Sequence, residues 1–278
     1  MLRKWDILES SFQSTGLTMN SSKLFLGFLL IIAFSCEVEK SQQTENSVPP
    51  PDIVTKEILA KFQNCPSDSL SCTYAQIIYP QFTDSARQSL NKSIIEKIHE
   101  HAASFMMEDS VQADLNAVAN AFVDDYARFV QEFPDYRLGW YLKIDAEIIY
   151  DSDEYISLMI AIETFTGGAH PNATTNYYVI NTKTNQQLAL SDIISDTTQF
   201  KQILEKNFRI QNGINDTVSL AEAGYNIYDD EFVINENVGI TGNQLIVHFN
   251  PYEIAPYSMG PTTVRIDKNE LKSILKLD

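Results

Sequence analysis

Basic residues are scarce in this chain of 278 residues, which has 20 Lys and Arg against 37 Asp and Glu and a formal net charge of −17. A protein that binds nucleic acid needs a basic patch to neutralise phosphates and release counterions. The deficit therefore excludes nucleic acid as a partner. An acidic surface favours basic partners through long-range attraction, which salt weakens, although solubility alone also accounts for such a charge.

The sequence also has little continuous hydrophobicity. Residues 24–34 form an apolar run of eleven residues that follows Lys23. At ~1.5 Å per residue this run is too short to cross a hydrocarbon core of ~30 Å as a helix. Its length and position are typical of the apolar region of a signal peptide, with Met19 as the start of translation. We therefore predict that residues 1–36 are a leader for export.

Cysteine is rare, with only three in the chain. The sequence Ala-Phe-Ser-Cys at residues 33–36 resembles the lipobox of bacterial lipoproteins, which predicts a lipid on Cys36 and attachment to a membrane. Cys65 and Cys72 remain as an even pair in an oxidising compartment and predict a disulfide. A zinc site is the weaker alternative for this pair, because no histidine or further cysteine lies nearby in the sequence.

The exported part divides into a short tether and a large folded region. Residues 37–51 are polar and end in three prolines, which is typical of a flexible spacer. The hydrophobic content of the whole chain, 44%, is ordinary for a protein that buries a core. We place an N-terminal unit at residues 52–135 and a C-terminal unit at residues 136–278.

Hydrophobic periodicity predicts alternating groups of strands and helices. Expected strands cover residues 52–62, 72–80, 140–150, 154–165, 174–182, 232–240, 244–249 and 263–266, and expected helices cover residues 90–105, 115–133, 197–208 and 268–277. The first two strands read as an antiparallel pair, and Pro134 closes the second helix. The pattern predicts an α+β fold, with mostly antiparallel sheets and packed helices in two sub-domains.

Common catalytic and metal-binding motifs are missing from the sequence. It contains no G-x-S-x-G, P-loop or H-E-x-x-H pattern. His99 and His101, two residues apart on an expected helix, point in different directions and cannot act as an i, i+4 metal pair. Nothing in the sequence fixes the separation of Glu163 and Glu253, so they are not read as a catalytic pair. We expect no metal, no cofactor and no catalytic residue.

Two loops carry the most distinctive sequence, TGGAHP at residues 166–171 and NPYEIAPYSMG at residues 250–260. Gly167 and Gly168 predict a tight turn that needs positive φ. His170, which precedes a proline, reads as a loop residue that bonds backbone. The tyrosines of the second loop, Tyr252 and Tyr257, either cap the core or form an exposed aromatic contact surface.

Together with L-x-L-x-D-I at residues 188–193, these loops resemble the extracellular domain family of RsiV, a lysozyme-binding anti-sigma factor. The segment from the cysteines through the paired helices resembles the domain that precedes it, also found in the peptidoglycan deacetylase PdaC outside the catalytic domain. The resemblance covers residues 52–275 and implies an α+β ectodomain of the cell envelope. The chain shows neither the sigma-binding segment of the first protein nor the deacetylase domain of the second, so signalling and deacetylation are not carried over.

These observations lead to two hypotheses of function. The first is a lipid-anchored, exported binding protein of the cell envelope, on the periplasmic or outer-membrane face, that recognises lysozyme or a peptidoglycan-related ligand. Its candidate binding residues are Gly167, Gly168, His170, Tyr252, Glu253 and Tyr257. The alternative is a cell-wall polysaccharide hydrolase or deacetylase with an unrecognised site. A pocket that held Glu163, His170 and Glu253 within hydrogen-bonding distance would favour this alternative.

Overall fold

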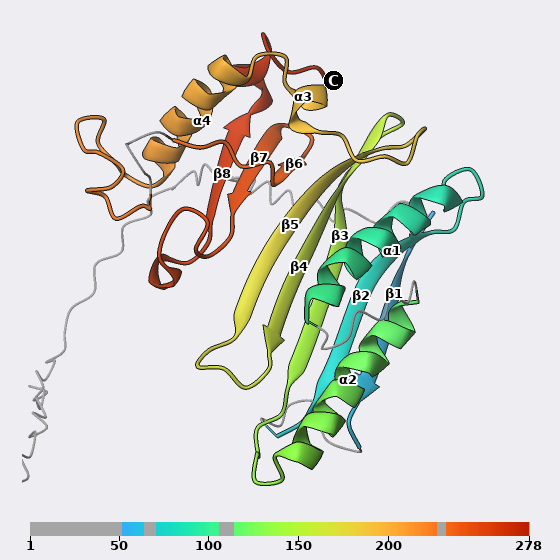
Figure 1. The fold of residues 1–278 in the computed structure, drawn as a ribbon. Coiled ribbons are helices and arrows are strands. Elements are labelled where there is room, and N and C mark those ends of the chain that lie inside the picture. The colour runs from blue at the N-terminus through green and yellow to red at the C-terminus, as the bar shows by residue number, and fades with distance from the viewer. Residues whose placement is uncertain (1–51, 64–70, 106–113, 227–231, 278) are drawn as a thin grey trace, which may run out of the picture. The chain divides into compact units, whose positions relative to one another are not determined.

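The computed structural model describes residues 52–63, 71–105, 114–226 and 232–277. Two sheets are present, a five-stranded one in the order β1-β2-β3-β4-β5 and a three-stranded one in the order β6-β7-β8 (Figure 1). The strands are β1 (Ile53–Lys61), β2 (Tyr74–Phe82), β3 (Tyr141–Asp151), β4 (Tyr155–Phe165), β5 (Asn172–Asn181), β6 (Val238–Ile240), β7 (Gln244–Phe249) and β8 (Thr262–Asp267). The longer helices are α1 (Gln88–Ala102), α2 (Leu115–Glu132) and α4 (Thr197–Gln211), and the short ones are α3 (Leu190–Ile193), η1 (Ala103–Phe105), η3 (Tyr257–Met259) and η4 (Lys268–Leu271). The predicted α+β class is confirmed.

The five-stranded sheet combines antiparallel pairs with one parallel pair. Strands β1 and β2 are antiparallel, as predicted, and β3, β4 and β5 follow one another in antiparallel order. Strand β3 pairs with β2 in parallel, since α1 and α2 lie between them in the sequence and return the chain to the same end of the sheet. The sheet takes strands from both sides of residue 135, where the sequence analysis divides the chain.

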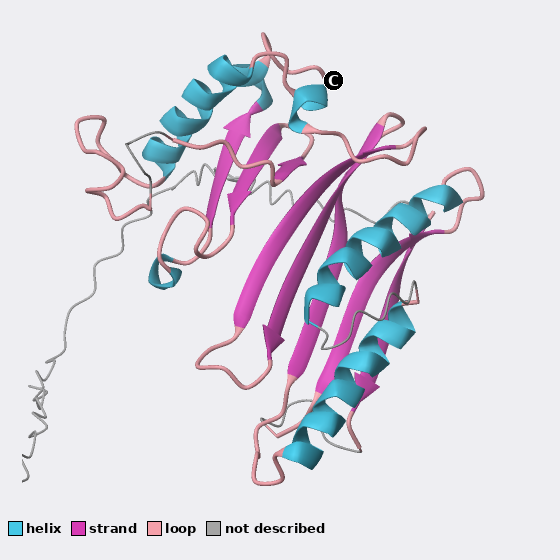
Figure 2. Ribbon diagram, in the orientation of Figure 1, coloured by secondary structure: helices cyan, strands magenta, loops and turns pink. Residues whose placement is uncertain are grey.

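Helices α1 and α2 cover one face of this sheet (Figure 2). Each helix buries the apolar stripe that the sequence predicts, for example Ile94 on α1 and Phe122 on α2. On β3, Leu142 and Ile144 are buried in the same core cluster as the two helices. The alternate residues of β3 therefore lie on the face that these helices leave open.

A close approach of two backbones fixes the register of β3 on β2. A Cβ atom on Gly139 would lie 2.2 Å from the carbonyl oxygen of Cys72. The next residue, Trp140, donates its backbone N–H to Thr73 Oγ1 at 2.9 Å. The carbonyl of Trp140 accepts the backbone N–H of Tyr74 at 3.1 Å. Only glycine allows this contact, which places Tyr74 opposite Tyr141.

The three-stranded sheet has its own hydrophobic cluster with α4, which includes Phe200, Leu204 and Phe208. It connects to the first sheet through polar contacts with backbone. Ser157 Oγ of β4 accepts the backbone N–H of Ile240 at 3.0 Å. The side chain of Asn237 accepts the N–H of Tyr177 at 2.7 Å and donates to the carbonyl of Thr175 at 2.8 Å. These bonds fix β6 and the residue before it against β4 and β5.

Two predicted elements are shorter in the structure. The expected strand at residues 232–240 is a strand only over Val238–Ile240, because the side chains of Asn235 and Asn237 occupy backbone groups that a longer ladder would use. The expected helix at residues 268–277 ends after the single turn of η4. The residues beyond it pair with the chain after α3 instead, with the N–H of Lys276 donating to Ile193 O at 2.8 Å. Both predictions were wrong in extent, because tertiary bonds overrode the local periodicity.

Several predictions fall on residues that the structure does not describe. The leader, Cys36 and the tether lie outside the described residues, so these remain predictions. Cys72 is described and buried, but its expected disulfide partner Cys65 is not described. Over the residues that are described, no helix is long and apolar enough to span a membrane.

Candidate functional site

The two distinctive loops meet in a stack of three aromatic rings. The ring of His170, from the β4–β5 loop, lies parallel to the ring of Tyr257 with centroids 3.9 Å apart. Tyr257 also stacks with Tyr252, with ring centroids 5.6 Å apart. The Tyr257 hydroxyl donates to the carbonyl of Pro171 at 3.1 Å and ties the second loop to the first. We call His170, Tyr252 and Tyr257 the aromatic stack.

The aromatic stack is presented to solvent and does not cap the core. Tyr252 is 61% exposed, His170 is exposed and Tyr257 is half-buried. Tyr252 has φ of +73°, in the left-handed region that bulky residues rarely adopt. Backbone strain at an exposed aromatic residue is a feature that occurs at ligand-binding positions. Of the two readings of the tyrosines, the geometry favours the contact surface.

Glu253 holds the loop in shape. Its carboxylate accepts the backbone N–H of Asn250 at 2.8 Å and the side-chain amide of Asn235 at 2.7 Å. Asn250 in turn accepts the backbone N–H of Thr175 on β5 at 2.7 Å. Asn235 and Asn250 were not identified from the sequence as positioning residues. The Asn-Pro step at residues 250–251, typical of a turn, was the one signal that marked Asn250.

Gly167 allows a close contact on the other side of the β4–β5 loop. Its φ is +91°, and a Cβ atom there would lie 2.3 Å from the hydroxyl oxygen of Tyr136. The predicted turn with positive φ is therefore confirmed at Gly167. It was wrong for Gly168, which has no positive φ and whose nearest neighbour to a Cβ is the carbonyl of His170 at 3.8 Å. Gly167 makes room for a neighbouring side chain, and Gly168 has no such constraint.

A row of aromatic residues crosses the open face of the first sheet at the same end. Tyr74 on β2 stacks on Tyr141 of β3 with centroids 6.0 Å apart, and Tyr141 stacks on Phe165 of β4 at 6.1 Å. Tyr141 donates its hydroxyl to Glu163 at 2.7 Å, and Lys143 lies 3.3 Å from the same carboxylate. The sequence predicted a strand at residues 140–150 but did not reveal this cluster.

The cluster on β3 and β4 shifts the titration of its members. Burial, and then the hydrogen bond to Glu163, raise the pKa of the Tyr141 phenol. The hydrogen bond from Tyr141, and then the charge of Lys143, lower the pKa of Glu163 despite partial burial. The phenol thus stays protonated and the carboxylate stays ionised at neutral pH, which is a stable hydrogen bond and not a poised acid or base.

The three residues named for the enzymatic alternative have separate partners in the structure. Glu163 bonds Tyr141 and Lys143, His170 Nδ1 bonds the carbonyl of Pro171 at 2.8 Å, and Glu253 bonds two asparagines. Within the described ranges, no group of three or more His, Cys, Asp or Glu could hold a metal ion. The arrangement therefore gives no support to a hydrolytic site built from these residues.

Comparison with known proteins places two family models on this chain. The model described as "Deacetylase PdaC" matches residues 67–173, and the one described as "Protein of unknown function (DUF3298)" matches residues 181–269. The first match covers most of the five-stranded sheet with α1 and α2, and the second covers the three-stranded sheet with α4. These matches support the two domains inferred from the sequence. They do not support the assignment of the second domain to the lysozyme-binding family of RsiV. None of the curated proteins matches.

Two crystal structures share the fold. A member of the DUF3298 family from Bacteroides fragilis has a TM-score of 0.60 at 16% identity, and the match covers 81% of this chain and 94% of that one. A DUF3298 family protein from Pseudomonas aeruginosa has a TM-score of 0.56 at 17% identity, with the same coverage of both chains. At this level of identity the likeness shows the fold alone.

Proposed function

We propose that this chain is an exported, lipid-anchored binding protein of the cell envelope that uses the aromatic stack to bind a basic protein, with lysozyme as the first candidate. The observation that carries the proposal is the exposed stack of His170, Tyr252 and Tyr257, which two loops from different sheets build together. Rigid tyrosines that are exposed before binding are typical of the residues that dominate interface energies.

The construction of the stack favours binding over a structural role. Tyr257 is held by Pro171, and the loop is held by Glu253 and Asn250, so the rings lose little further freedom when a partner covers them. Tyr252 keeps a strained backbone while most of its side chain remains in solvent, which folding alone does not require.

Charge supports a basic partner. Removal of residues 1–36 would leave 17 basic and 35 acidic residues in the exported chain, which makes it still more acidic. Complementary charge raises the rate of association and suppresses wrong partners. The match to the "Deacetylase PdaC" model also makes a peptidoglycan-related ligand worth testing, as the second candidate. The enzymatic alternative has no comparable support, because Glu163, His170 and Glu253 each bond to other groups.

Biolayer interferometry of the non-lipidated chain, residues 37–278, tests the proposal against a basic c-type lysozyme and against soluble peptidoglycan fragments, each at two salt concentrations. We expect micromolar or tighter binding to lysozyme that persists at about 0.15 M salt. Binding to the fragments but not to lysozyme would show that the ligand is a glycan and not a basic protein. Absence of binding to both, at either salt, would overturn the proposed function.

Lipid attachment needs its own test, since Cys36 lies outside the described residues. The full-length chain expressed in a bacterium should incorporate a labelled fatty acid and fractionate with membranes. The Cys36→Ala variant should lose the label, whereas Cys72→Ala should keep it if the chain remains folded. Equal labelling of the wild type and Cys36→Ala would contradict the anchor.

A further inference from the structure

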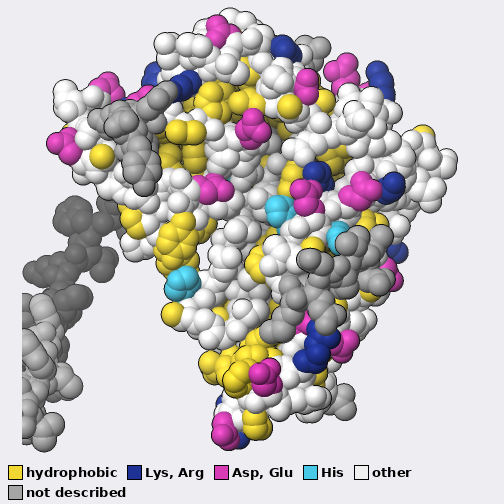
Figure 3. Space-filling model, in the orientation of Figure 1, with side chains coloured by type: hydrophobic (Ala, Val, Ile, Leu, Met, Phe, Trp, Pro, Cys, Tyr) yellow, Lys and Arg dark blue, Asp and Glu magenta, His cyan; other side chains and the backbone are white. Residues whose placement is uncertain are grey.

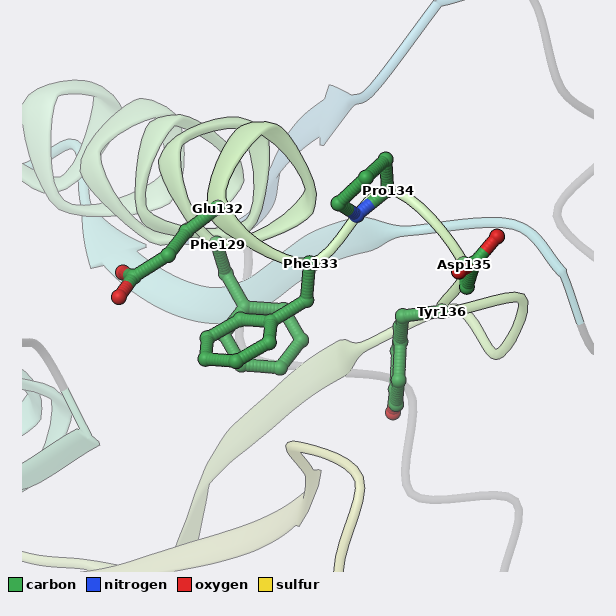
Figure 4. A pocket seen from close by; sticks show the side chains of 6 residues that line it. All are labelled: Phe129, Glu132, Phe133, Pro134, Asp135 and Tyr136. Carbon is green, nitrogen blue, oxygen red and sulfur yellow. The ribbon is translucent and has the colours of Figure 1, made fainter.

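A cleft of about 380 Å³ lies at the C-terminal end of α2, apart from the aromatic stack. Phe129, Phe133 and Tyr136 form its aromatic lining, and Glu132 and Asp135 lie at its two ends (Figure 4). Phe129 contacts Phe133 with ring centroids 4.8 Å apart and meets Tyr136 edge-on at 5.0 Å. Figure 3 shows hydrophobic side chains gathered near this end of α2, with acidic side chains beside them.

The sequence builds this cleft by ending a helix at an aromatic residue. Pro134 cannot continue α2 and pushes the preceding residue out of the helical region, so Phe133 has φ of −121° and ψ of 72°. Its ring remains 49% exposed although it packs on Phe129. Because Phe129 is in turn fixed against Trp140, with centroids 4.8 Å apart, the exposed ring rests on a rigid base.

The electrostatics of the cleft favour a cation. Carbonyl groups at the C-terminal end of a helix carry a partial negative charge, and the last turn of α2 contains no basic residue to offset it. The exposed carboxylates of Glu132 and Asp135 add two full charges. Aromatic faces attract a cation through their quadrupole, and most strongly when the cation is partly desolvated.

One cation of the protein already lies at the rim. The guanidinium of Arg137 approaches Asp135 at 3.9 Å and donates to the carbonyl of Pro134 at 2.5 Å. Its side chain is 74% exposed, so this ion pair is weak and open to exchange. The contact shows that the backbone and carboxylate at this end accept a guanidinium.

The cleft and the aromatic stack both contact the β4–β5 loop. Tyr136, which lines the cleft, packs against Gly167 at the distance that excludes a Cβ, and His170 of the same loop stacks on Tyr257. A protein that covers the stack is therefore placed to reach the cleft. This arrangement favours one extended contact surface over two unrelated sites.

We propose that the cleft at Phe129, Phe133 and Tyr136 binds an arginine side chain of the basic protein that the aromatic stack contacts. The inference rests on the proposed function for the class of partner. The guanidinium lies over the Phe133 ring and pairs with Glu132 or Asp135, which is an arrangement that an arginine suits better than a lysine because it is planar and donates several hydrogen bonds.

The test uses acetylated and amidated hexa-arginine as the probe and the fluorescence of Trp140 as the signal. The other tryptophan, Trp5, lies in the leader, so Trp140 is the single reporter of residues 37–278. At about 0.15 M salt, Phe133→Ala and Glu132→Gln should each weaken the probe's affinity about threefold to tenfold. Arg137→Gln should strengthen it by removing the competing cation.

Two control variants separate the cleft from general attraction to an acidic protein. Leu138→Ala removes a side chain that is 47% exposed next to the cleft, and Asp124→Asn removes one exposed charge from the same helix. Both should leave the affinity within about twofold. No binding, or an equal loss in Asp124→Asn and Glu132→Gln, would overturn the cleft proposal.

The experiment also separates this proposal from the proposed function. If lysozyme binding depends on the aromatic stack while Phe133→Ala leaves the affinity for hexa-arginine unchanged, the cleft proposal fails and the proposed function stands. If hexa-arginine binds through Phe133 while neither lysozyme nor any other basic protein binds, the cleft is a cation site and the proposed function fails.

Discussion

The substitution Gly167→Ala should destabilise the protein through two effects that the structure separates. At φ of +91° the backbone of any residue with a Cβ is strained, even where there is room for the side chain. In addition, the Cβ would lie 2.3 Å from the Tyr136 hydroxyl oxygen. Left-handed backbone in a non-glycine residue costs about 1–2 kcal/mol. The overlap with Tyr136 adds about 1 kcal/mol, because the tyrosine ring has to move against Phe129. We expect a total loss of about 2–3 kcal/mol in the free energy of unfolding.

A second substitution isolates the steric part. The Tyr136 hydroxyl is buried and has no hydrogen-bond partner among the described residues, so Tyr136→Phe alone should change stability by less than about 0.5 kcal/mol. In the Tyr136→Phe background, the atom nearest to the new Cβ is the ring carbon Cζ at 3.1 Å, and a small shift of the ring relieves this contact. Gly167→Ala should then cost about 1 kcal/mol less than in the wild type.

Two other glycines serve as controls. Gly213 has φ of +67° with nothing within 4 Å of a Cβ, so Gly213→Ala carries strain without overlap. Gly168 has neither a positive φ nor a steric overlap at the Cβ position, so Gly168→Ala should be nearly neutral in stability. Urea unfolding followed by Trp140 fluorescence measures all five variants. Equal costs of Gly167→Ala in both backgrounds, or a cost no larger than that of Gly168→Ala, would refute the reasoning.

Three further predictions concern other parts of the fold. Gly139→Ala should cost more than about 3 kcal/mol, because its Cβ would meet the rigid backbone of Cys72 at 2.2 Å, and loss of soluble, cooperatively unfolding protein checks this. Tyr252→Gly should be more stable than Tyr252→Ala by about 1 kcal/mol in urea unfolding, since both lose the contact with Tyr257 but only glycine relieves the positive φ. Burial lowers the pKa of His248 below 6.5, so its contribution to stability is complete above pH 6.5 and is lost as the pH falls towards the folded-state pKa. Unfolding free energies at several pH values should show this decrease and a smaller one in His248→Gln.

The regular parts of the fold follow from local patterns in the sequence. The stripes of α1 and α2 and the alternation of β3 have the periods of a helix and a strand on a packed core, so their positions were predictable. The parallel pairing of β2 with β3 was not predicted, because it depends on the backbone contact between Gly139 and Cys72. Residues 268–277 have helical periodicity, yet the residues after η4 pair with the end of α3, which local sequence does not show.

The candidate site was predictable in its residues but not in its assembly. The sequence marked His170, Tyr252 and Tyr257 because glycine, proline and tyrosine are concentrated in two loops. Their stacking depends on the bond from Asn250 to β5 and on the contact of Tyr257 with Pro171, both between residues more than seventy positions apart. The cleft beside Phe133 was not predicted at all, since an exposed phenylalanine before a proline reads only as the end of a helix.

The most direct test of the central claim is the affinity of residues 37–278 for a basic c-type lysozyme, measured for Tyr257→Ala beside Ile210→Ala. Ile210 is 65% exposed on α4 and serves as an exposed apolar control away from the aromatic stack. We expect Tyr257→Ala to weaken binding by about 2 kcal/mol, or roughly thirtyfold, and Ile210→Ala to have almost no effect. Equal affinities of the two variants, or no binding by the unsubstituted chain, would contradict the account.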